Sequence, residues 1–118
     1  NNYVSAAGLL ASMQALATAE TFGIAPETFT KVINGSTGRN NTTEVKLEPF
    51  IISRHYDSGF FLRLMAKDVG IASSLIKNAG FDAPITTALN EYLASAVDHL
   101  GEDADHTGLY EMVNPVKS

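Results

Sequence analysis

Apolar side chains recur every three or four residues along most of the chain, and no segment shows the apolar and polar alternation typical of a β-strand. This spacing is that of an α-helix, in which such residues share one face. The pattern predicts helices at residues 3–22, 26–33, 41–52, 61–78 and 84–100, and one or two further turns at 106–113. We therefore expect an all-α fold, a compact bundle of five or six helices around the long, apolar first helix.

Glycine and proline mark the ends of these predicted helices. Gly23, Gly80 and Gly101 stand where the helical patterns stop, as expected of residues that end a helix. Pro26 and Pro84 stand at first helical positions, where a missing N–H group costs nothing.

The helix predicted at 41–52 contains one signal for its start and one for an interruption. Asn41, with Glu44 three residues later, has the spacing of a capping box. Pro49 predicts a break or kink near Glu48, because proline lacks the N–H that the helix needs and its ring clashes with the preceding turn.

The first predicted helix is built almost entirely of small or apolar residues, with only Gln14 and Glu20 strongly polar between residues 3 and 22. A helix of this length spans roughly 30 Å, enough to cross a bilayer. A membrane span is nevertheless a poor prediction, because alanine, serine and threonine replace dense leucine and isoleucine and no basic residues flank the segment. We expect a central helix covered on all sides by other helices, in part by those of a second subunit.

The helix predicted at 61–78 carries a carboxylate within its apolar arc. At 100° per residue Asp68 falls between two apolar stripes. The stripes are Leu62, Met65, Val69, Ala72 and Ile76, and Leu64, Ile71 and Leu75. A buried carboxylate needs donors, since an unpaired one costs on the order of several kcal/mol. Either Asp68 accepts hydrogen bonds from a neighbouring helix or loop while Lys67 reaches water, or this turn lines a cleft in which Lys67 reaches a ligand.

Composition limits the classes of function. With 118 residues, 45% of them hydrophobic, the chain is long enough for one core and one domain. The absence of cysteine excludes disulfides, thiolate metal ligands and cysteine nucleophiles. The net charge is -5 and the basic residues form no run, so we expect no nucleic-acid partner. Because Asn1 leads directly into a helical pattern, we expect residues 1–118 to be one domain excised from a longer protein.

Two polar stretches suggest binding sites only weakly. The loop at 34–40 carries Ser36, Thr37 and Arg39 before a helix start, where a phosphate or carboxylate could bind. It lacks the lysine of a P-loop, so a polar surface loop is the simpler explanation. The stretch "HLGEDADH" at 99–106 collects two histidines and three acidic residues, but it follows a helix end and is better explained as a solvated turn. We predict no metal site.

Several short motifs, in their order and spacing, resemble the C-terminal helical domain of the 3-hydroxyisobutyrate dehydrogenase family of β-hydroxyacid dehydrogenases. They are the Asn1–Asn2 pair opening a small-residue helix with Glu20 near its end, "GIAPETF" at 23–29, and "FFLRLMAKD" at 60–68 leading to "AGFDAP" at 79–84. The resemblance covers nearly the whole chain. It implies a helical fold like that of the C-terminal domain of 6-phosphogluconate dehydrogenase.

The resemblance also implies an activity. In that family an N-terminal Rossmann domain, expected upstream of Asn1, binds NAD or NADP, and the helical domain closes over it. A short 3-hydroxy acid and its semialdehyde are interconverted in the cleft between the domains. For this protein we expect a cytoplasmic location, no membrane partner and a homodimer or homotetramer. An alternative is a non-catalytic helical domain that keeps the same fold for oligomerisation.

Site residues follow by matching positions. Asn2, with Asn1 beside it, matches the substrate-binding asparagine of the family. Lys67 matches the lysine that faces the cofactor, and Asp68 is then its buried orienting partner. The family's general acid/base is a lysine four residues before the asparagine, hence upstream of Asn1, so we expect no catalytic residue in this chain and no activity from the chain alone. The hydroxy acid and the choice between NAD and NADP stay open, because contacts from both domains set them.

Overall fold

The computed structural model describes residues 1–116, and within them six α-helices, one π-helical turn and one 3-10 turn follow each other along the chain. They are α1 (Asn2–Thr21), α2 (Pro26–Asn34), α3 (Asn41–Val45), η1 (Leu47–Ile52), α4 (Leu62–Asn78), α5 (Pro84–Leu100), η2 (His106–Leu109) and α6 (Tyr110–Val113). In this range no β-strand forms, only an isolated bridge between Phe61 and Asp105. The predicted all-α class is confirmed.

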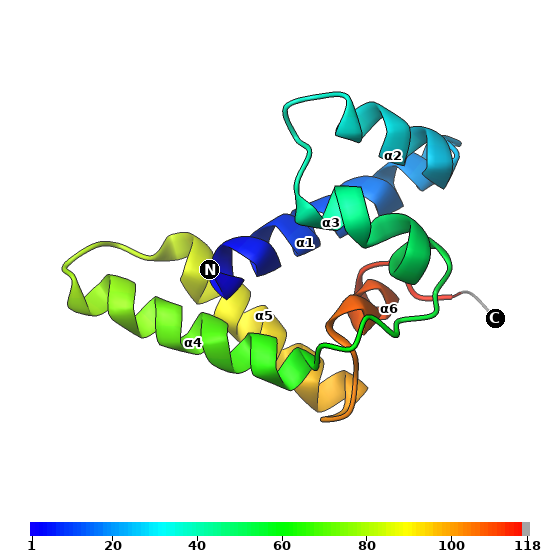
Figure 1. Ribbon diagram of the computed structural model, residues 1–118. Coiled ribbons are helices and arrows are strands. Elements are labelled where there is room, and N and C mark those ends of the chain that lie inside the picture. Colours follow the sequence, from blue (N-terminus) through cyan, green and yellow to red (C-terminus); the bar gives the residue numbers. More distant parts are fainter. Residues whose placement is uncertain (117–118) are drawn as a thin grey trace.

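Helix α1 joins two groups of helices (Figure 1). Near its C-terminal end it packs against α2, and α3 and η1 lie alongside. At its N-terminal end it packs against α4, which pairs with α5 as a helical hairpin. The turn η2 contacts both helices of this hairpin and also η1, and α6 contacts α1. The last two elements therefore close the space between the two groups.

The core lies where these elements meet. Fully buried apolar side chains come from α1, α4, α5 and α6 and from the turns η1 and η2. In α2 the buried residue is Thr30. The largest of the fully buried apolar residues are Leu9, Met13, Leu16, Leu47, Ile51, Leu62, Met65, Leu93, Leu109 and Tyr110. Each such side chain contributes roughly 1.5–3 kcal/mol by leaving water, so this shared core holds the two helix groups together.

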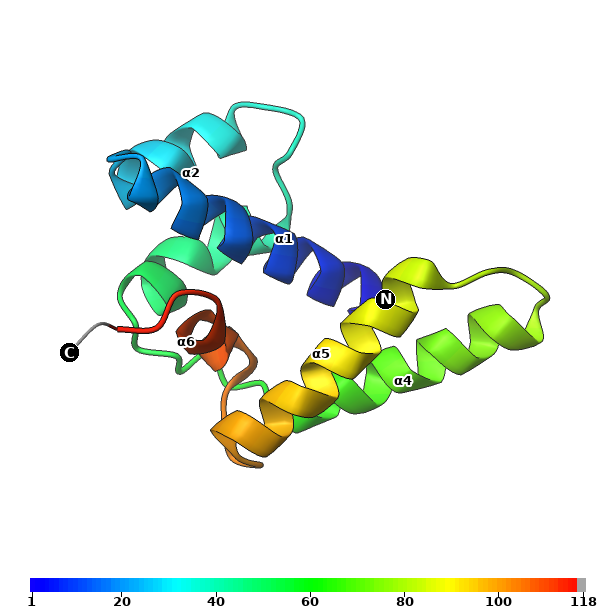
Figure 2. The ribbon, with the colours of Figure 1, turned by 180° about the vertical axis from the view of Figure 1, so that it is seen from behind.

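Helix α1 is not covered on all sides by this chain. Figure 2 shows it running across the front of the molecule, with no helix over that face. Leu9, Met13 and Leu16 are buried, whereas Val4 is 70% exposed and Gln14 is exposed. This chain alone therefore covers α1 only in part, and the covering expected from a second subunit stays a prediction. In the described part of the chain no helix is long and apolar enough to cross a membrane.

The third predicted helix starts one residue earlier and breaks two residues earlier than expected. Asn40, not Asn41, is the N-cap; its side chain accepts from Thr42 N and Thr43 N, and Thr43 completes the capping box. The α-helix ends at Val45 and continues from Leu47 as a π-helical turn around Pro49. Because Pro49 has no N–H, the regular hydrogen-bond ladder fails, and Ile51 N donates to Lys46 O, five residues back.

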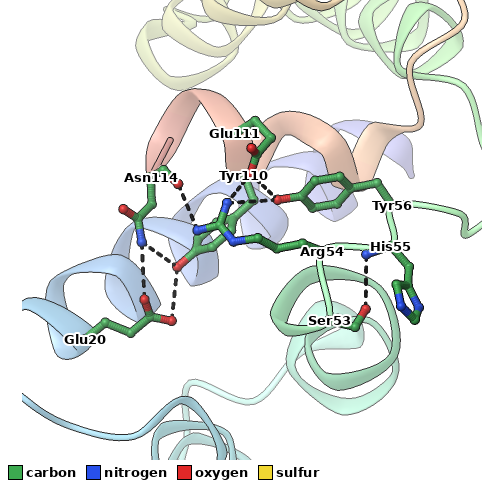
Figure 3. A network of polar contacts seen from close by, with 8 residues as sticks. All are labelled: Glu20, Ser53, Arg54, His55, Tyr56, Tyr110, Glu111 and Asn114. Atoms are coloured by element: carbon green, nitrogen blue, oxygen red, sulfur yellow. Dashed lines mark hydrogen bonds and ion pairs between the residues drawn. The ribbon is translucent and has the colours of Figure 1, made fainter. Parts of the chain in front are cut away.

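A polar cluster holds the loop that leads into α4 (Figure 3). Arg54 pairs with Glu111, and its Nη2 donates to Asn114 O at 3.0 Å. Tyr56 Oη donates to the same Glu111 carboxylate at 2.5 Å. Both Arg54 and Tyr56 have positive φ, 58° and 50°, a conformation that non-glycine residues adopt only when their surroundings impose it. The cluster thus fixes the backbone ahead of Ser58 and Phe60.

The same cluster reaches the end of α1. Asn114 Nδ2 donates to Glu20 Oε2 at 3.2 Å, and the Tyr110 hydroxyl lies 3.4 Å from Glu20 Oε1. The Arg54 guanidinium lies over the Tyr110 ring, 5.0 Å from its centroid. Glu20 therefore fastens the C-terminal segment to α1 (Figure 3).

Candidate functional site

The N-terminus of α1 meets the middle of α4 at a cleft of about 310 Å³. Asn2 Nδ2 donates a hydrogen bond of 2.5 Å to Asp68 Oδ2 across this contact. The cleft is lined by Asn1, Asn2, Tyr3, Asp68, Ile71, Ala72 and Leu75. Three of the four site residues chosen from the sequence, Asn1, Asn2 and Asp68, are thus brought together.

Asp68 is half-buried and pairs with Asn2, not with its neighbour Lys67. Leu62, Met65 and Val69 of the first predicted stripe are buried, but Leu64, Ile71 and Leu75 of the second are 39%, 50% and 64% exposed. Asp68 consequently lies at the edge of the buried face and not within it. Asp68 therefore accepts its hydrogen bond from a neighbouring helix, as the first alternative predicted. It also lies at the rim of a cleft, as in the second alternative, but Lys67 does not line that cleft.

Lys67 is exposed on α4 and is not among the residues that line this cleft. Successive residues on a helix point about 100° apart, so Lys67 and Asp68 cannot face the same spot. Lys67 forms no ion pair within residues 1–116. Its ammonium therefore points to solvent, free to meet an anion from outside this domain.

The bond to Asp68 decides what Asn2 can offer a ligand. A carboxylate only accepts, so it holds the amide NH₂ group of Asn2 and turns the carbonyl oxygen Oδ1 away. The charge of Asp68 also disfavours a second carboxylate beside it. Asn2 Oδ1 accepts only a long hydrogen bond of 3.5 Å from Asn1 Nδ2, so it can also accept from a ligand hydroxyl.

Asn2 also borders a second cleft, of about 330 Å³, on the other side of the α1 N-terminus. Several elements contribute to the other walls of this cleft: α1, α3, η1, α4, η2 and the loop before α4. The lining residues are Ser5, Val45, Lys46, Phe50, Ser58, Phe60, Met65 and His106. Asn2 is thus shared by two adjoining clefts.

Asp105 organises the far wall of the second cleft. It accepts from Gly59 N at 2.9 Å, Phe60 N at 3.2 Å, Thr107 N at 3.0 Å and Ser58 Oγ at 2.9 Å, and also from the Thr107 hydroxyl. Burial alone would raise the pKa of this carboxyl group, but the hydrogen bonds from Thr107, Ser58 and Gly59 outweigh it and lower the pKa. Asp105 is therefore an ionised anchor that ties the loop before α4 to η2.

His106 is almost fully buried, with 2% of its surface exposed. Its Nδ1 lies 3.1 Å from the carbonyl oxygen of Phe60 and 3.1 Å from Ser58 Oγ. Because a carbonyl only accepts, Nδ1 carries the proton and Nε2 is an unprotonated acceptor. Within the described residues Nε2 has no hydrogen-bond partner. Burial lowers the pKa of His106 and the charge of Lys46 lowers it further, against the opposing effects of Phe60 and Asp105.

The lowered pKa predicts how stability depends on pH. At a pH below about 6.5, the pKa of an unfolded histidine, the His106 side chain binds a proton in the unfolded chain but stays neutral in the folded protein. The free energy of unfolding should therefore fall as the pH is lowered from 7 to 5, and His106→Phe should lose part of this fall. Urea denaturation at pH 7, 6 and 5 measures it.

The exposed His99 of α5 provides the matched control. His99→Gln should keep the pH dependence of the wild type. An unchanged fall in stability in His106→Phe would contradict the assignment of the effect to His106.

Residues 1–113 match a family model described as the NAD-binding domain of NADP-dependent 3-hydroxyisobutyrate dehydrogenase. The chain belongs to the 3-hydroxyisobutyrate dehydrogenase family. The resemblance inferred from the short motifs is thereby confirmed.

Two curated relatives align with much of the chain. A probable mitochondrial 3-hydroxyisobutyrate dehydrogenase of Arabidopsis thaliana is 28% identical over 116 residues, which are 93% of this chain and 33% of that protein. The 2-(hydroxymethyl)glutarate dehydrogenase of Eubacterium barkeri is 33% identical over 86 residues, 73% of this chain and 29% of that protein. The chain thus spans about a third of the length of these relatives.

A solved structure shares the fold. The Mycobacterium tuberculosis 3-hydroxyisobutyrate dehydrogenase, determined with L-serine, superposes with a TM-score of 0.83 at 25% identity. The match covers 97% of this chain and 41% of that one. The helical arrangement is therefore that of a domain of a 3-hydroxyisobutyrate dehydrogenase.

Sequence reasoning missed the polar residues of the second cleft, Lys46, Ser58 and His106. His106 was assigned to a solvated acidic turn, although Asp105 followed by Thr107 is a pattern typical of a capped turn. Among residues 1–116 no three histidine or acidic side chains converge in a way that would hold a metal ion. The loop with Ser36 and Arg39 is exposed, and Arg39 bonds to the Ser36 carbonyl at 3.1 Å.

Proposed function

We propose that this chain is the substrate-binding and dimerisation domain of an NAD(P)-dependent dehydrogenase that interconverts a short 3-hydroxy acid and its semialdehyde. The observation that carries the proposal is the bond from Asn2 to Asp68 at the rim of a cleft, in a member of the 3-hydroxyisobutyrate dehydrogenase family. The two relatives support it, since one is named a 3-hydroxyisobutyrate dehydrogenase and the other a 2-(hydroxymethyl)glutarate dehydrogenase, and both names denote acids with a hydroxyl on the carbon β to a carboxylate. A cytoplasmic location stays a prediction.

Asn2 has the central role of this domain in the proposed reaction. Its Oδ1 accepts from the substrate hydroxyl and so aligns the carbon that carries it, while Asp68 keeps the amide in one orientation. A lysine four residues before Asn2 would lie one helical turn away on the same face, within reach of the same hydroxyl. Such a lysine suits the proton transfer, because burial brings its pKa toward neutrality.

Lys67 fits the cofactor side of the proposal. It is an exposed ammonium on the same helix as Asp68, with no ion pair in the described residues, which suits the phosphate groups of a dinucleotide held by a second domain. The bound NAD or NADP would supply the hydride chemistry. This domain contributes charge, substrate orientation and closure of the cleft.

An apolar surface supports the proposed homodimer or homotetramer. A groove of about 560 Å³ runs between α1 and α5 on the uncovered side of α1. It is lined by Ala7, Leu10, Ala11, Gln14, Pro84, Ile85, Ala88, Leu89 and Tyr92. Ile85 is 63% exposed in the single chain. We assign this groove to the second subunit that the small residues of α1 indicate.

The proposal is tested in the full-length enzyme, by following nicotinamide reduction with 3-hydroxyisobutyrate and either NAD or NADP. Lys67→Ala should lower kcat/KM about 10–100-fold, because a hydrogen bond to a charged phosphate contributes about 1.5–3 kcal/mol. The Michaelis constant for the cofactor should carry most of the loss, and the melting temperature should stay as in the wild type.

Lys77→Ala, an exposed lysine at the end of the same helix, is the control and should keep wild-type kinetics. Wild-type kinetics in Lys67→Ala would remove Lys67 from the cofactor site. A full-length protein that oxidises no 3-hydroxy acid with either cofactor would overturn the proposed function and favour an oligomerisation domain.

A further inference from the structure

The second cleft contains two polar groups that the proposed reaction does not use, Lys46 and His106. They come from separate elements, Lys46 from the junction between α3 and η1 and His106 from η2. The cleft adjoins Asn2, so a ligand whose hydroxyl lies at Asn2 has room to extend toward both. Its volume of about 330 Å³ lies at the lower end of the range for small-ligand sites, about 300–1,000 Å³.

His106 adds a polar group to the wall of this cleft. Its Nδ1 is fixed by Phe60 O and Ser58, and its Nε2 is a buried acceptor without a partner in the described residues. A buried acceptor left without a donor is costly, and native structures rarely keep one. Within residues 1–116 nothing supplies such a donor, so Nε2 is open to one from water or from a ligand group.

Lys46 places a positive charge in the wall of the second cleft. Its side chain is half-buried, and burial lowers the pKa of its ammonium while the charge of Asp105 opposes this effect. Asp105 does not neutralise it by contact, because no ion pair joins the two and the Asp105 oxygens are taken by Ser58, Gly59, Phe60 and Thr107. A partly desolvated ammonium without a counter-ion in residues 1–116 is suited to a carboxylate from a ligand.

The cleft that Asn2 and Lys46 share also has apolar walls. These walls are Val45, Phe50, Phe60 and Met65. Such walls suit methylene groups that join two polar ends of one molecule. The near end is confined by Asn2 and Asp68, which favour a hydroxyl over a carboxylate at that point.

We propose that the enzyme acts on a dicarboxylic 3-hydroxy acid, whose distal carboxylate binds Lys46 in the second cleft. This inference rests on the proposed function, because it takes Asn2 as the residue that holds the reacting hydroxyl. The inference adds two points to the proposed function: the class of substrate, and Lys46 as a residue that determines specificity.

The test uses the full-length enzyme and two probes that differ in one group. In 2-(hydroxymethyl)succinate a CH₂COO⁻ group replaces the methyl group of 3-hydroxyisobutyrate. The wild type should prefer the dicarboxylate by tenfold or more in kcat/KM. Lys46→Met should reduce this preference at least tenfold, Lys46→Arg should retain most of it, and the exposed Lys31→Met should not change it. Equal turnover of both probes by the wild type, or an unchanged preference in Lys46→Met, would overturn the inference while leaving the proposed function intact.

A binding measurement separates the inference from the reaction. Methylsuccinate carries both carboxylates but no hydroxyl, so it cannot be oxidised at that position. Calorimetric titration should give a dissociation constant at least tenfold weaker for Lys46→Met than for the wild type and for Lys31→Met. If neither hydroxy acid is turned over but this difference is found, the proposed function fails and the carboxylate site stands. Equal binding by wild type and Lys46→Met overturns the site whatever the turnover.

Discussion

Replacing Asp105 by alanine is expected to lower the free energy of unfolding by about 3–5 kcal/mol, since each buried donor left without an acceptor costs about 1–3 kcal/mol. The substitution removes the acceptor of Gly59 N, Phe60 N and Thr107 N, and with it the link between the loop before α4 and η2. The loss of unfolding free energy should be smaller than the sum of the three separate costs, because Gly59 is exposed and its N–H can bond to water instead. Urea denaturation at pH 7 measures the effect.

Two variants make the Asp105 result specific. Asp105→Asn keeps one acceptor oxygen and should fall between wild type and Asp105→Ala. Asp103→Ala removes an exposed carboxylate two residues earlier and should change stability by less than about 0.5 kcal/mol. If Asp105→Ala unfolded at the same urea concentration as Asp103→Ala, the hydrogen bonds to Asp105 would contribute nothing net to the fold.

The helices were predictable because their determinants are local. Glycine at positive φ ends α1 and α5, at Gly23 (φ 83°) and Gly101 (φ 96°), as their positions at the ends of the helical patterns indicated. The side of α1 that faces the core was not predictable, because its small and apolar residues lie all around the helix. Only contacts from distant elements decide which of these residues are buried.

The start of α3 shows how a distant contact decides between neighbouring residues. The sequence favours Asn41 with Glu44, because a capping box usually has glutamate at its third position, whereas Asn40 with Thr43 shares only the spacing. In the fold Asn40 Nδ2 also donates to Ser12 Oγ of α1 at 3.1 Å, which only Asn40 is placed to do. The tertiary bond therefore adds to the cap and selects the earlier residue.

The candidate site was predictable residue by residue, but not as a geometry. Helical periodicity marked Asp68 as a carboxylate in need of donors, and the family resemblance marked Asn2. Their hydrogen bond joins residues 66 positions apart and depends on how α1 crosses α4. Lys46 and His106 come to one cleft only because the chain breaks at Pro49 and because Asp105 folds η2 against the loop before α4.

The bond between Asn2 and Asp68 should be visible as coupling in a double-mutant cycle on the full-length enzyme. Asn2→Ala is expected to lower kcat/KM on the order of 100–1,000-fold, the range found when one aligned hydrogen-bonding group of an active site is removed. Asp68→Ala should cause a similar loss, since it frees the Asn2 amide to rotate. The double variant should then lose little more than the larger single loss.

Stability measurements on the same variants separate positioning from folding. Asp68→Ala leaves the Asn2 amide without its acceptor and should lower the free energy of unfolding by about 1–3 kcal/mol. Asp68→Asn keeps an acceptor oxygen for Asn2 Nδ2 and should recover most of this stability, but an amide in place of the carboxylate can also present its NH₂ group to Asn2 Oδ1. That competing arrangement should occupy the oxygen that we assign to the substrate hydroxyl, so activity should recover less than stability does. If the losses of the two single alanine variants multiply in the double variant, Asn2 and Asp68 act independently, and the hydrogen bond between them does not orient the substrate-binding amide.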